Sequence, residues 1–174
     1  MARIGGRRGV AVLGALVALA VVITLAWAED RKPSPAPGQG PLWSKQCVKD
    51  PKDHDVCFVQ QFAIALPQNV ALLNVSIGYL GPDGKVRMII RAPLAIFLPP
   101  GIQGTIDSGK PFTLPVESCD QGGCRTAVDM DDATTGQLRR GKVLTVRYIT
   151  MDRKAVDIPI KLEGLAAALS TLSR

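Results

Sequence analysis

Short runs of alternating apolar and polar residues, separated by turn residues, occupy most of the chain after residue 42. In the run over 143–150, Leu144 and Val146 fall on one face of a strand while Thr145 and Arg147 fall on the other. Gly81-Pro82-Asp83-Gly84 supplies turn residues between two such runs and predicts a hairpin. The pattern predicts strands over 57–63, 70–79, 85–91, 95–98, 101–107, 112–116, 125–130, 143–150 and 156–162.

Two segments have helical rather than strand character. Asp131 or Asp132 can cap the N-terminus of a helix that reaches Arg140, and Gly141 follows as a stop. A second segment, residues 165–172, is apolar on one face. Many short strands with one or two short helices predict an all-β fold, an antiparallel β-sandwich.

The first 28 residues differ from everything that follows. Basic residues at positions 3, 7 and 8 precede an uncharged apolar run over 10–27, and Ala26-Trp27-Ala28 has the small residues of a cleavage site. This order predicts a secretory signal peptide over 1–28; an uncleaved membrane anchor is the alternative, and it would leave the domain on the same side. Residues 29–41 are rich in Pro and Gly and are expected to be a linker, so the domain spans 42–174.

Charge and cysteine content narrow the class of protein. Without the signal peptide, 18 basic and 15 acidic residues leave a net charge of +3, and the basic residues are scattered, which argues against nucleic-acid binding. Four cysteines in an exported domain predict two disulfides. Three pairings are possible, and closeness in sequence favours Cys47–Cys57 with Cys119–Cys124.

Several segments together resemble the invasion-associated locus B family, whose members are exported proteins of α-proteobacteria. The resemblance covers roughly residues 42–172 and rests on the order of these segments: Trp43-x3-Cys47, Cys57-Phe58-Val59-Gln60-Gln61, residues 101–110, Cys119-Asp120-Gln121-Gly122-Gly123-Cys124, residues 138–142 and residues 158–165. It implies an immunoglobulin-like sandwich in the periplasm or outside the cell. The long apolar run over 10–27 and the Pro-rich linker depart from the family and leave open a form held on the inner membrane, facing the periplasm. Some members of the family are linked with entry of bacteria into host cells.

One loop holds candidate metal ligands. Asp50-Pro51-Lys52-Asp53-His54-Asp55 contains the chain's single histidine, and Asp53, His54 and Asp55 are weak candidates to ligate a metal. A solvated loop between two bridged cysteines is the plainer interpretation. A periplasmic metal-binding protein or an enzyme that uses this loop remains the alternative function.

Other motifs do not favour catalysis. No G-x-S-x-G segment accompanies His54, so a serine hydrolase is not favoured. Four residues separate Cys119 from Cys124, whereas thiol–disulfide enzymes use C-x-x-C at a helix start. We therefore expect no catalytic residues and no cofactor. The sequence favours an exported binding protein whose partner is an envelope or host component, recognised through loops at one end of the sandwich or an exposed strand edge.

Overall fold

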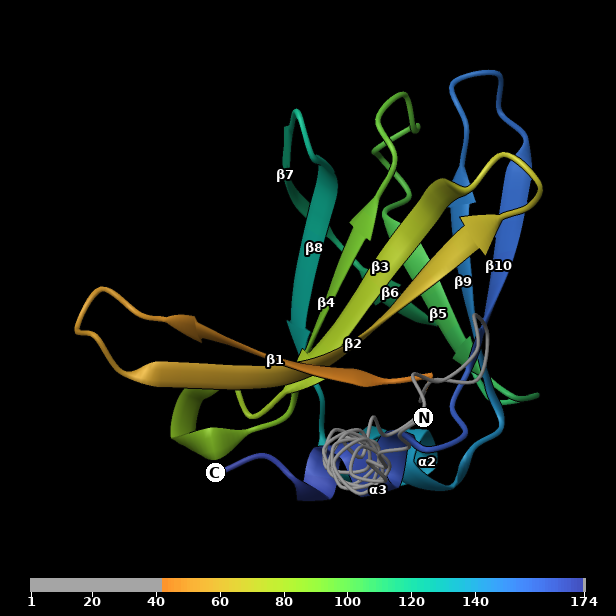
Figure 1. The fold of residues 1–174 in the computed structure, drawn as a ribbon. Helices are drawn as coiled ribbons and strands as arrows, with labels where there is room; N and C mark the ends of the chain where they lie inside the picture. The colour runs from red at the N-terminus through yellow and green to blue at the C-terminus, as the bar shows by residue number, and fades with distance from the viewer. Residues whose placement is uncertain (1–41, 174) are drawn as a thin grey trace, which may run out of the picture. The chain divides into compact units, whose positions relative to one another are not determined.

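The computed structural model describes residues 42–173, which form two antiparallel sheets and two α-helices (Figure 1). The six-stranded sheet has the order β1-β2-β3-β4-β8-β7, and the four-stranded sheet has the order β10-β9-β5-β6. The larger sheet contains β1 (Ser44–Lys49), β2 (Asp55–Ala65), β3 (Val70–Gly78), β4 (Arg87–Ala92), β7 (Val116–Asp120) and β8 (Gly123–Asp129). The smaller sheet contains β5 (Ile102–Ile106), β6 (Phe112–Leu114), β9 (Val143–Ile149) and β10 (Ala155–Lys161). The predicted all-β sandwich is confirmed.

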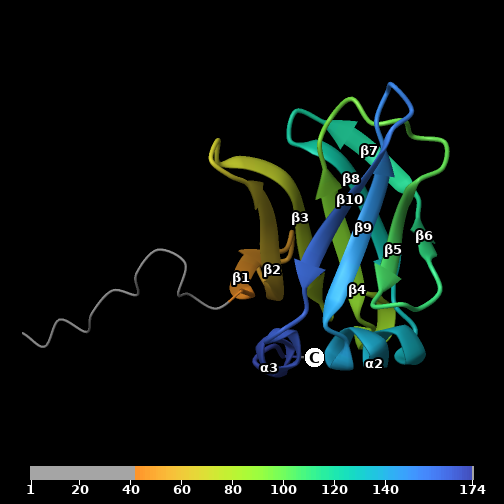
Figure 2. The ribbon, with the colours of Figure 1, turned by 90° about the vertical axis from the view of Figure 1, so that its right-hand side faces the viewer.

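The hydrophobic core lies between the two sheets (Figure 2). Every second residue of a central strand points inward, so Leu144 and Val146 are fully buried while Arg147 is exposed, as the alternation predicts. The larger sheet contributes Val59, Val75, Ile77, Met88 and Ile90, and the smaller sheet contributes Ile102, Leu114, Leu144, Val146 and Ile160. Both sheets are therefore amphipathic, with one face buried and the other toward solvent.

The two helices lie together at one end of the sandwich (Figure 2). They are α2 (Asp132–Arg140) and α3 (Leu165–Ser170). Asp131 is the N-cap of α2, because its carboxylate accepts the backbone N–H of Thr134 at 2.6 Å. Leu138 of α2 is buried, as are Leu165 and Leu169 of α3, so the helices close this end of the core.

Some elements differ from the expected ones. Residues 95–98 do not form a strand: only Ile96 makes an isolated bridge, to Thr150, and the flanking prolines and the positive φ of Ala95 prevent a longer ladder. Conversely, β1 and β7 are strands that the pattern does not predict, because most of their side chains on both faces are exposed and no apolar alternation results. The predicted signal peptide (1–28) and linker (29–41) lie outside the described residues. Within residues 42–173, no helix has the length and apolar character needed to cross a membrane.

Candidate binding surface

Large apolar side chains are exposed mainly at one end of the domain. Nine such side chains are exposed in residues 42–173, and seven of them lie on the β2–β3 hairpin, the β4–β5 loop and the β9–β10 loop: Phe62, Ile64, Leu66, Val70, Leu94, Leu98 and Met151. These three connections lie at the end away from α2 and α3 (Figures 1 and 2). Exposed apolar side chains gathered in one region are typical of interaction surfaces. We call this region the apolar end.

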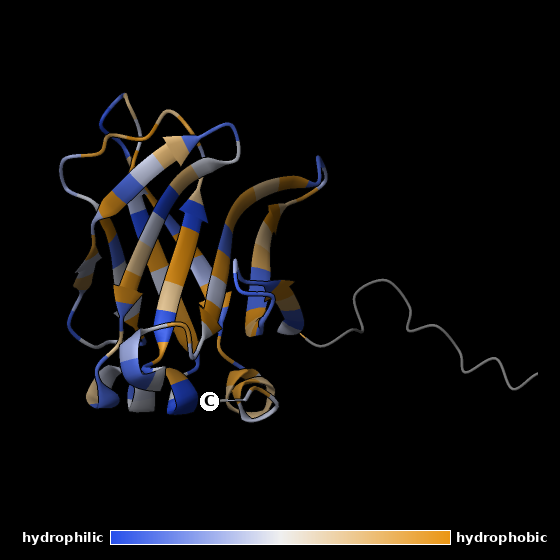
Figure 3. Ribbon diagram, turned by 90° about the vertical axis from the view of Figure 1, so that its left-hand side faces the viewer, coloured by the Kyte–Doolittle hydropathy of each residue, from blue (hydrophilic) through white to orange (hydrophobic). Residues whose placement is uncertain are grey.

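The β2–β3 hairpin forms the first part of the apolar end. Phe62 and Ile64 are two apart on β2 and so point to the same face, where 51% and 53% of their surfaces are exposed. Leu66, in the turn, is 77% exposed. Figure 3 shows apolar colouring along both strands of this hairpin. Residues 56–82, which contain the whole hairpin, include no charged side chain.

The β4–β5 and β9–β10 loops form the second part, and contacts between them fix their conformation. The backbone N–H of Phe97 donates to the carbonyl of Ile149 at 2.7 Å. The guanidinium carbon of Arg153 lies 3.5 Å from the centre of the Phe97 ring, which is cation–π geometry. These contacts present three apolar side chains from a fixed backbone: Leu94, Leu98 and Met151.

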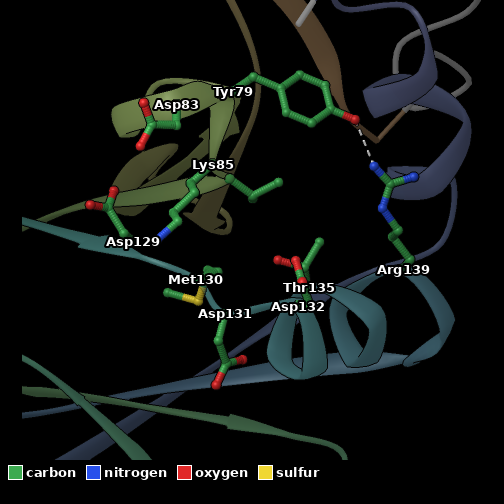
Figure 4. Close-up of a pocket in the computed structure, with 11 residues that line it drawn as sticks. Tyr79, Asp83, Lys85, Asp129, Met130, Asp131, Asp132, Thr135 and Arg139 are labelled. Atoms are coloured by element: carbon green, nitrogen blue, oxygen red, sulfur yellow. Dashed lines mark hydrogen bonds between the residues drawn. The ribbon is translucent and has the colours of Figure 1, made fainter.

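A pocket of about 520 Å³ lies at the opposite end, between the 3-10 turn η1 (Pro82–Gly84), the end of β8 and α2 (Figure 4). Across it, Arg139 Nη2 donates to the hydroxyl of Tyr79 at 2.7 Å. The carboxylate of Asp129 accepts hydrogen bonds from Arg87, which hold the pKa of Asp129 below its usual value. Asp131 caps α2. These polar groups connect β4 to β8 and the residue that follows β3 to α2, so we assign the pocket a structural role.

The loop with the candidate metal ligands is organised by its own hydrogen bonds. One carboxylate oxygen of Asp50 accepts the backbone N–H groups of Lys52 and His54, each at 2.8 Å. The other oxygen lies 3.2 Å from His54 Nδ1, and the hydrogen bond from the His54 backbone lowers the pKa of Asp50. Asp53 and Asp55 pair with Lys49. The described part of the chain contains no group of three His, Cys, Asp or Glu side chains placed to hold a metal ion, so Asp53, His54 and Asp55 do not converge on one point.

Both disulfides connect neighbouring strands, with the pairing that closeness in sequence favours. Cys47 of β1 is opposite Cys57 of β2, and Cys119 of β7 is opposite Cys124 of β8. Each bridge joins an outer strand of the larger sheet to its neighbour. The six-residue segment from Cys119 to Cys124 is a β-hairpin rather than the helix start that redox enzymes use.

The apolar end was not identified from the sequence. Its residues belong to runs that resemble buried strands, and the pattern alone does not distinguish an exposed Ile64 from a buried Val59. A usable signal was present, because residues 56–82 and 92–106 lack charged side chains although parts of both stretches reach the surface. Long surface segments without charge indicate a protein or lipid contact.

The chain is similar to proteins of one family. The family model described as invasion associated locus B (IalB) protein matches residues 43–173. A crystal structure of invasion associated protein B from Bartonella henselae is similar with a TM-score of 0.67 and 24% sequence identity, covering 75% of this chain and 89% of that chain. At this identity the likeness shows a common fold. No curated protein matches the chain significantly.

Proposed function

This chain belongs to the invasion associated locus B family, and on that premise we propose that it is an exported, non-catalytic binding protein of the bacterial envelope, associated with the invasion of host cells. The partner is a component of the envelope or of the host. The proposed place of action is the periplasm or the outside of the cell, with attachment to the inner membrane if residues 1–28 are retained.

One observation carries this proposal: the gathering of exposed apolar side chains at the apolar end. A rigid sandwich that presents apolar residues from several connecting loops is a common arrangement for recognition. Leaving such residues in water is unfavourable by about 25 cal/mol per Å² of apolar surface, so covering them with a partner supplies binding free energy. The contact between Arg153 and Phe97 orders the two loops before binding, which reduces the entropy lost on association.

Photo-crosslinking in intact cells tests the proposal. A photoreactive amino acid is placed at Leu94, Leu98 or Met151, one at a time, in the full chain. Ala167 is the matched control, because it is exposed on α3 at the other end of the domain. We expect discrete adducts from the three loop positions and none from Ala167. Cell fractionation of the same samples shows which compartment holds the protein and its adducts.

Two outcomes would overturn the proposal. The first is the absence of adducts at all three loop positions when the protein is folded and exported. The second is a hydrolytic, redox or metal-dependent activity of the purified chain that is lost on His54→Ala, since this would assign the function to the loop of Asp50–Asp55.

A further inference from the structure

Strand β2 extends beyond the strand that flanks it. The ladder between β1 and β2 runs from Lys49 opposite Asp55 to Ser44 opposite Gln60. β2 continues to Ala65, and over this distal part it pairs only with β3, on its other side. Within residues 42–173, the side of Gln61–Ala65 away from β3 therefore has no strand partner. We call this segment the open edge.

The chain leaves β2 at this point because of Trp43. Residues 42–43 form a bend, and the indole N–H of Trp43 donates to the carbonyl of Lys161 at 3.1 Å. Trp43 is buried to 97% of its surface, so this anchor draws the chain from β2 toward β10. The side-chain amide of Gln61 donates to the carbonyl of Leu42 at 3.2 Å, next to the bend. The open edge therefore begins just past the last β1–β2 pair, where the bend at residues 42–43 turns the chain away from β2.

The other outer strands carry features that oppose pairing with another chain. β1 has Lys45 and Lys49, and β7 has Glu117 and Asp120. β10 contains Pro159, which lacks an N–H, and β6 is only three residues long. The open edge has neither a charged residue nor a proline.

The side chains of the open edge are suited to contact with an identical segment. Phe62 and Ile64 lie half exposed on one face of β2, with Ala63 between them. If two copies pair antiparallel about a two-fold axis at Ala63, Phe62 of each copy lies opposite Ile64 of the other. An aromatic residue opposite a β-branched residue is a favourable cross-strand pair. Without residues 1–28 the chain still carries a net charge of +3, so two copies meet best where neither presents charge.

We propose that the open edge binds a second copy of this chain, with antiparallel β2–β2 pairing centred on Ala63, which joins the two larger sheets into one. A lipid bilayer is a poorer occupant, because hydrocarbon offers no partner for the unpaired backbone N–H and C=O groups of a strand edge. This self-association goes beyond the proposed function and leaves Leu94, Leu98 and Met151 available to a partner.

Light scattering tests the proposal on the full chain, purified from cells that export it, over a hundredfold range of concentration. We expect a concentration-dependent dimer.

Ile64→Lys places a charge opposite Phe62 of the second copy and weakens the dimer at least about tenfold. Val48→Lys is the matched control, because Val48 is exposed to the same degree (52%) but lies on β1. It should leave the dimer unchanged. Circular dichroism verifies that both variants are folded.

A second measurement tests the register. Ala63→Cys places one thiol on the two-fold axis, so mild oxidation should give a disulfide-linked dimer, whereas Val48→Cys should not. The proposal is overturned by a monomeric wild type, by a dimer that resists Ile64→Lys, or by the absence of crosslinking through Ala63→Cys. If the wild type is monomeric but the backbone amides of the open edge are protected from hydrogen exchange, then the chain's own residues 29–41 cover that edge. Binding to lipid vesicles that is lost on Ile64→Lys would place lipid there, and either result rejects the dimer while leaving the loop crosslinking test unaffected.

Discussion

Arg147 and Asp157 are direct neighbours across β9 and β10 and form a two-point ion pair. Arg147 Nε donates to Asp157 Oδ1 at 2.6 Å, and Nη2 donates to Oδ2 at 2.7 Å. The hydrogen bonds from Arg147 lower the pKa of Asp157, and the same pair raises the pKa of Arg147. Both side chains are about half exposed, so water and salt weaken their attraction.

We expect this pair to make the stability of the domain depend on pH in acid. An unfolded Asp has a pKa of about 3.9, and the folded value is lower, so the pair stabilises the fold fully above the unfolded pKa. This stabilisation is lost as the pH falls through the folded value. Asp157→Asn should therefore reduce the free energy of unfolding at pH 7 and change it little at about pH 2. Urea unfolding followed by circular dichroism measures this difference, which should shrink in high salt; equal effects at both pH values would contradict it.

The central strands were predictable because each has one buried face. Leu144 and Val146 are buried while Arg147 is exposed, so burial on one side leaves an alternating pattern in the sequence. β1 has no such pattern, since five of its six residues are exposed. Its position follows instead from the ladder with β2 and from the bridge between Cys47 and Cys57.

The residues of the apolar end could be identified only from the structure, and not from the sequence. Val59 and Ile64 lie on the same strand and are both β-branched, yet the first is fully buried and the second is half exposed. Their difference depends on the face of β2, on where β1 ends and on how far the hairpin extends past the smaller sheet, none of which is local in sequence. That the chain binds through loops or a strand edge stays a prediction, and the residues exposed there could be identified only from the tertiary structure.

Trp43 is expected to be a major contributor to stability. Its side chain is buried, and it connects the start of β1 to the end of β10 through the carbonyl of Lys161. Trp43→Ala should lower the free energy of unfolding by about 3–5 kcal/mol, because it leaves a cavity. Trp43→Phe should cost less, about 1 kcal/mol, because the amide of Gln61 still reaches the same carbonyl at 3.4 Å. Urea unfolding of the two variants measures the order, and a larger loss for Trp43→Phe would contradict this assignment.

Removal of either disulfide should destabilise the domain. In the chain-entropy model, closing loops of these lengths contributes about 2–3 kcal/mol, slightly more for the longer Cys47–Cys57 loop. Cys124 is also buried, whereas Cys47 is exposed, so Cys119→Ala/Cys124→Ala additionally loses core packing. The measurement is unfolding of each double variant, with hydrogen exchange to locate the effect. Cys47→Ala/Cys57→Ala should increase exchange in β1, and unchanged protection there would show that the bridge does not hold this strand.

Gly123 and Gly84 form a matched pair for separating backbone strain from steric clash. Both have positive φ, +114° and +71°, so alanine at either position is strained, by roughly 1–2 kcal/mol for a left-handed residue. A Cβ on Gly123 would lie 2.2 Å from the carbonyl oxygen of Ala92 on β4, whereas a Cβ on Gly84 meets nothing within 4 Å. Because the Ala92 carbonyl belongs to a central strand, it cannot move away without disturbing the β4–β8 ladder. Gly123→Ala should therefore lower the midpoint of urea unfolding clearly more than Gly84→Ala. Equal losses would mean that the β7–β8 hairpin shifts freely on the sheet, despite its disulfide.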